Sequence, residues 1–187
     1  MNIMIVGVGG QGSLLASKIL GNVLIEKGYD VKVSEVHGMS QRGGSVVTYV
    51  KYGEKVYSPI IDKGEADVII AFEQLEAVRY IEYLKPNGKM LVSTQKIDPM
   101  PVIIGNAKYP ENIEGLLANI ETTFVDAVKL AEQAGSVKAT NIVLLGVLSK
   151  NMDILAETWK ENIKKLVAER FVALNIKAFD LGSSVCA

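Results

Sequence analysis

The fold is decided near the start of the chain, where residues 2–12 read Asn2-Ile3-Met4-Ile5-Val6-Gly7-Val8-Gly9-Gly10-Gln11-Gly12. The apolar first half is typical of a parallel strand that is covered on both faces. After the glycines, apolar residues from Leu14 to Leu24 recur at helical spacing, and Gly28 supplies a C-terminal stop. A second strand follows at 31–36. We therefore expect a β-α-β unit in which a right-handed crossover joins two paired parallel strands.

The remaining pattern continues in the same style. Helices are predicted from residue 73 to about 84, ending at Pro86-Asn87-Gly88, and as three closing helices after Asp126. A turn at Gly53-Glu54 would make a short hairpin that ends near Tyr57. Further strands are predicted at 45–51, 67–72, 89–93, 102–105 and 122–125. The fold class expected is a three-layer α/β/α domain over residues 1–187, with a mostly parallel, Rossmann-like sheet of six or seven strands and C-terminal helices.

Composition narrows the functional classes. The chain has 187 residues, 49% of them hydrophobic, and a net charge of -1 from 20 basic and 21 acidic side chains. Such a chain has enough apolar residues to fold, and it lacks the basic surplus of a nucleic-acid binder. The mean hydropathy of +0.23 favours a protein partner over part of the surface.

The single cysteine, Cys186, limits the chemistry further. One thiol can form neither a disulfide framework nor a cysteine-ligated iron–sulfur cluster within the chain, and it favours a reducing cytoplasm. No apolar run approaches about 20 residues, and no basic segment precedes the first strand, so neither a membrane span nor a signal peptide is expected.

The glycine spacing carries the first functional signal. Gly7, Gly9 and Gly12 satisfy G-x-G-x-x-G between a strand and a helix, where backbone N–H groups can approach a pyrophosphate. Glu35 ends the second strand, where a ribose-binding carboxylate would lie. A nicotinamide or flavin site is one interpretation. The alternative is that the glycines only allow the helix to pack on the sheet.

A second polar loop follows the second strand, in Glu35-Val36-His37-Gly38-Met39-Ser40-Gln41-Arg42-Gly43-Gly44. It holds a histidine, a hydroxyl, an amide, a guanidinium and three glycines, which is unusually polar for a connection. Ligands of doubly wound sheets bind outside the carboxyl ends of the strands. Both loops are therefore predicted to face one crevice.

These two loops, together with Ala139-Thr140-Asn141-Ile142-Val143-Leu144-Leu145-Gly146, resemble the gamma-type domain of 2-oxoacid:ferredoxin oxidoreductases. The resemblance covers essentially the whole chain. Within that family the chain is most similar to the stand-alone beta subunits of the indolepyruvate branch, in length and in residues 102–117.

The resemblance implies an oxidative decarboxylation, in which an aryl pyruvate, coenzyme A and oxidised ferredoxin give an arylacetyl-CoA, carbon dioxide and reduced ferredoxin. Thiamine diphosphate with Mg²⁺ and iron–sulfur clusters would do this chemistry. This chain has one cysteine and no Gly-Asp-Gly run followed by an Asn pair, the usual thiamine diphosphate signature. It therefore fits an accessory subunit that is inactive alone, whose large partner holds these cofactors and reduces ferredoxin.

Three hypotheses remain for the role of the two loops. The first is that the glycine loop, with Gln41 and Arg42, positions coenzyme A or the partner's cofactor region at a shared crevice. The second is that both loops only form the subunit interface. The third is a free-standing dinucleotide-dependent oxidoreductase. The candidate ligand- or partner-binding residues are Gly7, Gly9, Gly10, Gln11, Gly12, His37, Ser40, Gln41, Arg42, Gly43, Gly44 and Asn141.

Three of these candidates have individual interpretations. His37 is the only histidine, so a multi-histidine metal site is excluded and a loop-ordering role is favoured. Ser40 lacks the context of a nucleophile. Asn141 lies in an apolar helical run, where a buried amide needs hydrogen bonds, and is predicted to tie the C-terminal helices to a glycine loop. The sequence leaves the identity of the 2-oxoacid open.

Overall fold

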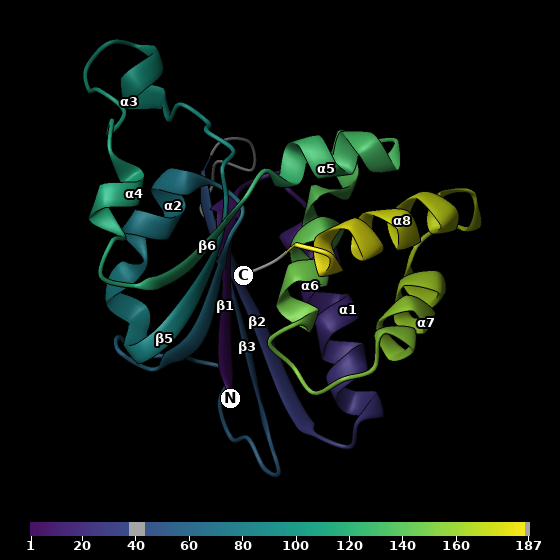
Figure 1. The fold of residues 1–187 in the computed structure, drawn as a ribbon. Helices are drawn as coiled ribbons and strands as arrows, with labels where there is room; N and C mark the ends of the chain where they lie inside the picture. The colour runs from purple at the N-terminus through teal and green to yellow at the C-terminus, as the bar shows by residue number, and fades with distance from the viewer. Residues whose placement is uncertain (38–43, 186–187) are drawn as a thin grey trace.

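A computed structural model describes residues 1–37 and 44–185, apart from the side chain of His37, and shows one sheet between two layers of helices (Figure 1). The six strands have the order β2-β3-β1-β4-β5-β6. Their bounds are β1 Asn2–Val8, β2 Asp30–His37, β3 Ser45–Gly53, β4 Ala66–Ala71, β5 Leu84–Ser93 and β6 Glu121–Val125. The predicted three-layer, mostly parallel fold is confirmed.

The predicted pairing of the first two strands is wrong, because β3 lies between them. β1, β4, β5 and β6 are parallel neighbours, whereas β3 is antiparallel to both β1 and β2. β3 pairs with β2 from Val46, opposite His37, to Gly53, opposite Asp30, and its other edge pairs with β1. The helical crossover therefore spans one inserted strand.

The alternation of side chains along β1 separates two cores. Ile3 and Ile5 belong to the larger cluster on one face, and Met4 and Val6 to a smaller cluster on the other. The larger core lies under α1 Ser13–Glu26, α5 Ala127–Ala134, α6 Thr140–Ser149, α7 Ala156–Leu166 and α8 Val172–Ser183. The smaller core lies under α2 Gln74–Arg79 and α4 Ile113–Leu116 (Figure 1).

The innermost helix is α6, in which every residue from Thr140 to Leu148 is buried. It crosses α8 at two glycines. A Cβ at Gly146 would overlap the carbonyl oxygen of Phe179, and one at Gly182 would overlap that of Val143. The backbones of the two helices therefore touch. Trp159 of α7 completes this layer and stacks on Phe179 with ring centroids 5.9 Å apart.

Several predicted elements differ from the structure. Residues 102–105 are not a strand but belong to α3 Met100–Ile103 and its end, since Pro101 fits a first helical turn and cannot donate to a sheet ladder. The hairpin to Tyr57 is absent from the described residues, because Asp30 accepts a hydrogen bond from the backbone of Val56 (2.9 Å) and holds that segment beside β2.

The helix predicted from residue 73 is shorter than expected, since it ends at Arg79 and a 3₁₀ turn, η1 Ile81–Tyr83, leads into β5. Pro86-Asn87-Gly88 lies within β5, next to a register shift against β4. Among the described residues after Asp126 there are four helices of eight or more residues, not three. The fourth, α8, has no clear amphipathic pattern, because its buried face includes Asn175 and Gly182 beside Ala178 and Phe179. Two more 3₁₀ turns are η2 Val137–Ala139 and η3 Glu169–Phe171.

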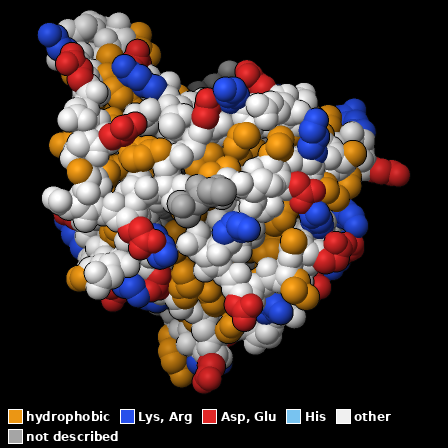
Figure 2. Space-filling model, in the orientation of Figure 1, with side chains coloured by type: hydrophobic (Ala, Val, Ile, Leu, Met, Phe, Trp, Pro, Cys, Tyr) orange, Lys and Arg blue, Asp and Glu red, His pale blue; other side chains and the backbone are white. Residues whose placement is uncertain are grey.

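The segment around α3 projects from the rest of the molecule (Figure 1). Its hydrogen bonds are local, as in the bonds from the amides of Asn106 and Ala107 to Pro101. Met100, Ile103 and Ile104 are each about 60% exposed, and Figure 2 shows hydrophobic side chains on this projection. In the described part of the chain, no helix is both long and apolar enough to cross a membrane.

Candidate functional site

The candidate site lies at the carboxyl ends of β1, β4 and β5. β1 leads into α1 on one face of the sheet, and the neighbouring β4 leads into α2 on the other. Such a change of face marks the crevice where open α/β sheets usually bind ligands. The glycine loop, residues 7–12, connects β1 to α1 at this point.

The two predicted loops meet. The amide of Gly9 donates to the carbonyl of Gly44 (3.0 Å), so the start of β3 lies against the glycine loop. Gly12 is the N-cap of α1 with a φ of 83°, a left-handed conformation that favours glycine.

The side chain of Gln11 folds back across the crevice. Its Oε1 accepts from the amide of Val8 (2.7 Å), and its Nε2 donates to the carbonyl of Phe72 and to Oε1 of Gln95, both at 2.9 Å. Phe72 follows β4 and Gln95 follows β5. Gln11 therefore joins the ends of three strands and occupies the middle of the crevice.

Asn141, on α6, holds the other end of the loop. It is 3% exposed, donates from Nδ2 to the carbonyl of Gly12 (3.1 Å) and accepts from the amide of Ile142 (2.9 Å). This confirms the predicted tie between the C-terminal helices and a glycine loop.

Two hollows flank the glycine loop, and Gly10 and Gly12 line both. The larger, about 630 Å³, lies toward α5 and α6 and is otherwise lined by Gln11, Gln95, Val128, Val137, Lys138 and Thr140. The smaller, about 340 Å³, lies toward β2 and is otherwise lined by Gly9, Ser13, Leu14, Glu35 and Val46. Both sizes fall in the range of small-molecule sites.

Glu35 lies at the smaller hollow, near the position expected for a ribose-binding carboxylate. Its Oε2 accepts from the hydroxyls of Ser13 and Thr48, each at 3.2 Å. The carboxylate therefore links α1 to β3 across the end of β2.

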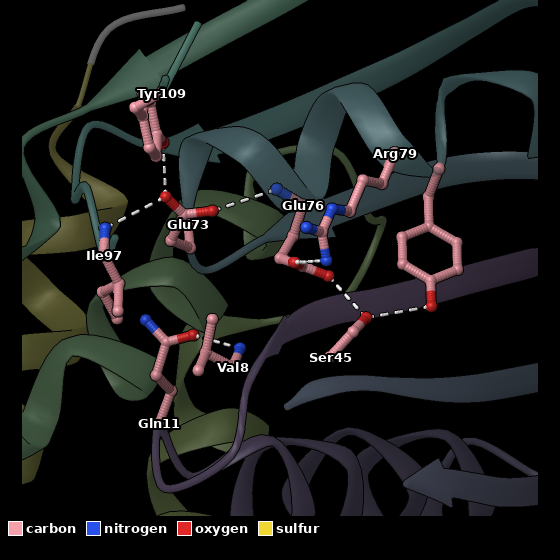
Figure 3. A network of polar contacts seen from close by, with 9 residues as sticks. Val8, Gln11, Ser45, Glu73, Glu76, Arg79, Ile97 and Tyr109 are labelled. Atoms are coloured by element: carbon pink, nitrogen blue, oxygen red, sulfur yellow. Dashed lines mark hydrogen bonds and ion pairs between the residues drawn. The ribbon is translucent and has the colours of Figure 1, made fainter. Parts of the chain in front are cut away.

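A buried carboxylate network lies beside the glycine loop (Figure 3). Glu73 is 1% exposed; its Oε2 accepts from the amide of Glu76 (3.0 Å), and its Oε1 accepts from the amide of Ile97 (3.1 Å) and the hydroxyl of Tyr109 (2.5 Å). Burial, and then Glu73, raise the pKa of Tyr109. This hydroxyl therefore stays protonated and anchors the base of the projecting segment.

The neighbouring carboxylate, Glu76, reaches the start of β3. It accepts from the hydroxyl of Ser45 (2.5 Å) and pairs with Arg79 (3.1 Å), and Ser45 also lies 3.1 Å from the Tyr80 hydroxyl. Burial raises the pKa of Glu76. Sequence reasoning missed both carboxylates because their partners are distant in sequence; the local signal was a short Glu73-x-x-Glu76 repeat after a buried strand.

The predicted site residues thus divide into two groups. The structure brings together Gly7, Gly9, Gly10, Gln11, Gly12, Gly44 and Asn141. The other predicted residues lie outside the described residues: Ser40, Gln41, Arg42 and Gly43, together with the side chain of His37. Among described residues, no group of three or more His, Cys, Asp or Glu side chains is arranged to hold a metal ion.

Comparison with known proteins gives this geometry a context. Residues 2–185 match the family described as "Pyruvate ferredoxin/flavodoxin oxidoreductase". The chain is 46% identical to "Indolepyruvate oxidoreductase subunit IorB" of Pyrococcus horikoshii, and the match covers 97% of this chain and 93% of that protein.

Two further relatives show how the same fold is used elsewhere. The crystal structure of a keto/oxoacid ferredoxin oxidoreductase gamma subunit from Geobacter sulfurreducens superposes with a TM-score of 0.73 at 26% identity, covering 97% of this chain and 95% of that one. "Ketoisovalerate oxidoreductase subunit VorA" of Methanothermobacter marburgensis is 25% identical over 98% of this chain, which corresponds to 36% of its own length. The fold therefore occurs both as a separate chain and within a longer one.

Proposed function

Because the chain belongs to the pyruvate ferredoxin/flavodoxin oxidoreductase family, we propose that it is the accessory subunit of an enzyme that oxidatively decarboxylates aryl pyruvates. An aryl pyruvate, coenzyme A and oxidised ferredoxin would give an arylacetyl-CoA, carbon dioxide and reduced ferredoxin. The observation that carries this proposal is the near full-length match to a protein named as an indolepyruvate oxidoreductase subunit.

The cofactors of such an enzyme do not fit this chain. It has one cysteine, and its described residues form no metal-ligating cluster. We assign thiamine diphosphate, Mg²⁺ and the iron–sulfur clusters to a large catalytic partner in the same cytoplasmic complex. Electrons then pass to ferredoxin from that partner, and this chain takes no part in the redox step.

Coenzyme A suits the shared crevice better. The larger hollow offers backbone at Gly10 and Gly12, apolar walls at Val128 and Val137, and the ammonium of Lys138. Coenzyme A combines phosphates with a long, weakly polar arm. The backbone N–H groups and the ammonium would bind the phosphates, and the apolar walls would contact the arm. We propose that Arg42, from the second loop, adds a guanidinium for a phosphate or carboxylate.

Arg42→Ala in the assembled enzyme should lower apparent coenzyme A affinity or turnover by roughly ten- to a hundredfold, as expected for losing about 1.5–3 kcal/mol. Arg42→Lys should recover only part of this, because a point charge lacks the planar fork. Intact kinetics combined with failed assembly would instead favour the interface hypothesis for this loop.

The large partner would also cover apolar surface of this subunit. Met100, Ile103 and Ile104 lie exposed on the projecting segment, and permanent complexes bury about 2,000 Å² or more. We expect the two subunits to co-elute in gel filtration at micromolar concentration. Separate elution at that concentration would contradict a permanent complex.

The position of the Gln11 side chain argues against the dinucleotide hypothesis. In this chain the crevice between β1 and β4 contains the Gln11 side chain, hydrogen-bonded to Phe72. Titration of NAD, NADP and FAD is expected to give negligible binding to the free chain and to the complex. A micromolar dissociation constant, about 8 kcal/mol of binding free energy, would restore that hypothesis.

The direct test of the proposal begins with the chain purified alone. It should be colourless, contain no thiamine diphosphate and reduce no electron acceptor with any 2-oxoacid. Turnover by the isolated chain would contradict an accessory role. Substrate preference is then measured on the complex with indolepyruvate, phenylpyruvate, and branched-chain and dicarboxylic 2-oxoacids.

A further inference from the structure

We propose that Gln11 and Asn141 are positioning residues, which fix the two ends of the glycine loop so that its middle, at Gly10, is presented to the ligand of the assembled enzyme. This rests on the proposed function, since the ligand is taken to be coenzyme A. The two amides would act through the loop backbone, because their hydrogen-bonding groups are engaged within the protein.

The polar atoms of the Gln11 side chain all form hydrogen bonds within the protein. An amide has two N–H donors, and both donors of Gln11 are occupied, by the carbonyl of Phe72 and by Gln95. Its oxygen accepts from the amide of Val8. A ligand would have to break these bonds to reach the Gln11 donors, so the side chain serves as a strut between strands.

The two outer glycines of the G-x-G-x-x-G motif make room for these struts. A Cβ at Gly7 would lie 2.7 Å from Oε1 of Gln11 and 3.0 Å from Cβ of Phe72. A Cβ at Gly12 would lie 2.6 Å from Nδ2 of Asn141. In this chain, the space beside these two glycines is taken by the amide groups of Gln11 and Asn141.

The loop is open only between the struts. At Gly10, no atom lies within 4 Å of the position of a Cβ, the φ is +99°, and the residue lines both hollows. The amide of Gly9, the preceding residue, donates a hydrogen bond to the carbonyl of Gly44. A loop that is fixed at both ends and open in the middle can present backbone groups without an ordering cost at binding.

The struts come from independent parts of the chain. Asn141 belongs to the buried helix α6. Gln95, which accepts a hydrogen bond from Gln11, follows β5. The carbonyl of Gln95 is held in turn by the amide of Gln74 (3.1 Å). A rigid scaffold thus supports the loop from both faces of the sheet. This arrangement suits a backbone site whose geometry must be set before the ligand arrives.

The test uses Gln11→Met and Asn141→Leu, which keep side-chain size and remove the hydrogen bonds. The matched control is Gln74→Met, since Gln74 is an amide at the same sheet edge that donates to Thr94 (2.6 Å) and does not touch the glycine loop. Gln95→Met, which removes one of the three bonds of Gln11, serves as a milder variant if Gln11→Met does not fold.

Two readouts separate the inference from the proposed function. In the free chain, amide hydrogen exchange over residues 7–12 should speed up in both strut variants and stay at the wild-type rate in Gln74→Met. In the assembled enzyme, the KM for coenzyme A should rise about tenfold in the strut variants, with the KM for the 2-oxoacid within about twofold of wild type.

Unchanged exchange in the loop would overturn the struts themselves. Faster exchange with an unchanged KM for coenzyme A would overturn their positioning role. If the wild-type complex did not use coenzyme A, the proposed function would fall, while the exchange data would still show whether the two amides hold the loop.

Discussion

Glycines do different work at the crossing of α6 and α8 and in the loop after β1. At the crossing, the space beside Gly146 and Gly182 is filled by the backbone of the other helix. In the loop, the space beside Gly7 and Gly12 is filled by the side chains of Gln11 and Asn141. Helix backbone atoms cannot rotate away from an added Cβ, whereas a side chain can change its rotamer. The first region therefore sets stability, and the second sets the geometry of the glycine loop.

The largest effect is expected at the crossing. Gly182→Ala would force a Cβ into the carbonyl of Val143, so the helices must separate. Overpacking of this kind should cost about 3 kcal/mol of unfolding free energy, or roughly 6–12 °C in Tm for a chain of this size. The matched control is Gly21→Ala, inside α1, where the nearest atom to a Cβ is 3.7 Å away and helix propensity favours alanine. Equal Tm losses in the two variants would contradict the packing argument.

A smaller effect is expected in the loop, and it should differ between neighbouring glycines. Both Gly10 and Gly12 have positive φ, which costs an alanine roughly 1–2 kcal/mol. Gly12→Ala must also displace Asn141, whereas Gly10→Ala meets open space. Urea unfolding should therefore rank Gly12→Ala as the less stable variant. The reverse order would show that the Asn141 strut contributes little.

The smallest effect concerns the pH dependence of stability contributed by Glu76, which accepts a hydrogen bond from Ser45 at the start of β3. Burial raises its pKa above the ordinary 4.5, so the folded chain binds this proton more tightly than the unfolded chain. The contribution of Glu76 to stability is therefore greatest at low pH and is lost as pH rises through the raised pKa. Glu76→Gln should remove this loss, and the stability of wild type relative to the variant should fall as pH rises above 4.5.

Glu161→Gln is the control for that experiment. Glu161 is exposed, and its hydrogen bond with Lys164 lowers its pKa, so any trend with pH should run in the opposite direction. Unfolding curves measured from about pH 3 to pH 7 would show the Glu161 slope around and below pH 4.5 and the Glu76 slope above it. A slope for Glu76→Gln that matched wild type would mean that the buried carboxylate does not titrate in this range.

Local patterns predicted some of this structure well. The strand–glycine loop–helix start was predictable because its apolar spacing changes from strand to helix within a few residues. Asn141 was predictable because a lone amide in an apolar helix needs a partner. Both inferences depend only on neighbouring residues and on the cost of burying a polar group.

Other features depend on contacts that no local pattern contains. The insertion of β3 beside β1 is set by pairing at long sequence separation. The hydrogen bonds that Glu73 accepts from the amide of Ile97 and the hydroxyl of Tyr109 also join residues that are far apart in sequence. The helix α8 was missed because its buried face includes Asn175 and Gly182, so apolar residues alone do not mark that face in the sequence. The two outer glycines leave room for the side chains of Gln11 and Asn141, and the glycine spacing alone does not contain these contacts.

We propose that this chain completes an enzyme whose catalytic cofactors lie on another subunit. The most direct measurement is indolepyruvate- and coenzyme A-dependent reduction of ferredoxin by the purified large partner, titrated with this chain. We predict no turnover from this chain alone, little from the partner alone, and a rise that saturates at a fixed subunit ratio. Full activity of the partner without this chain, or turnover by this chain without the partner, would contradict the account.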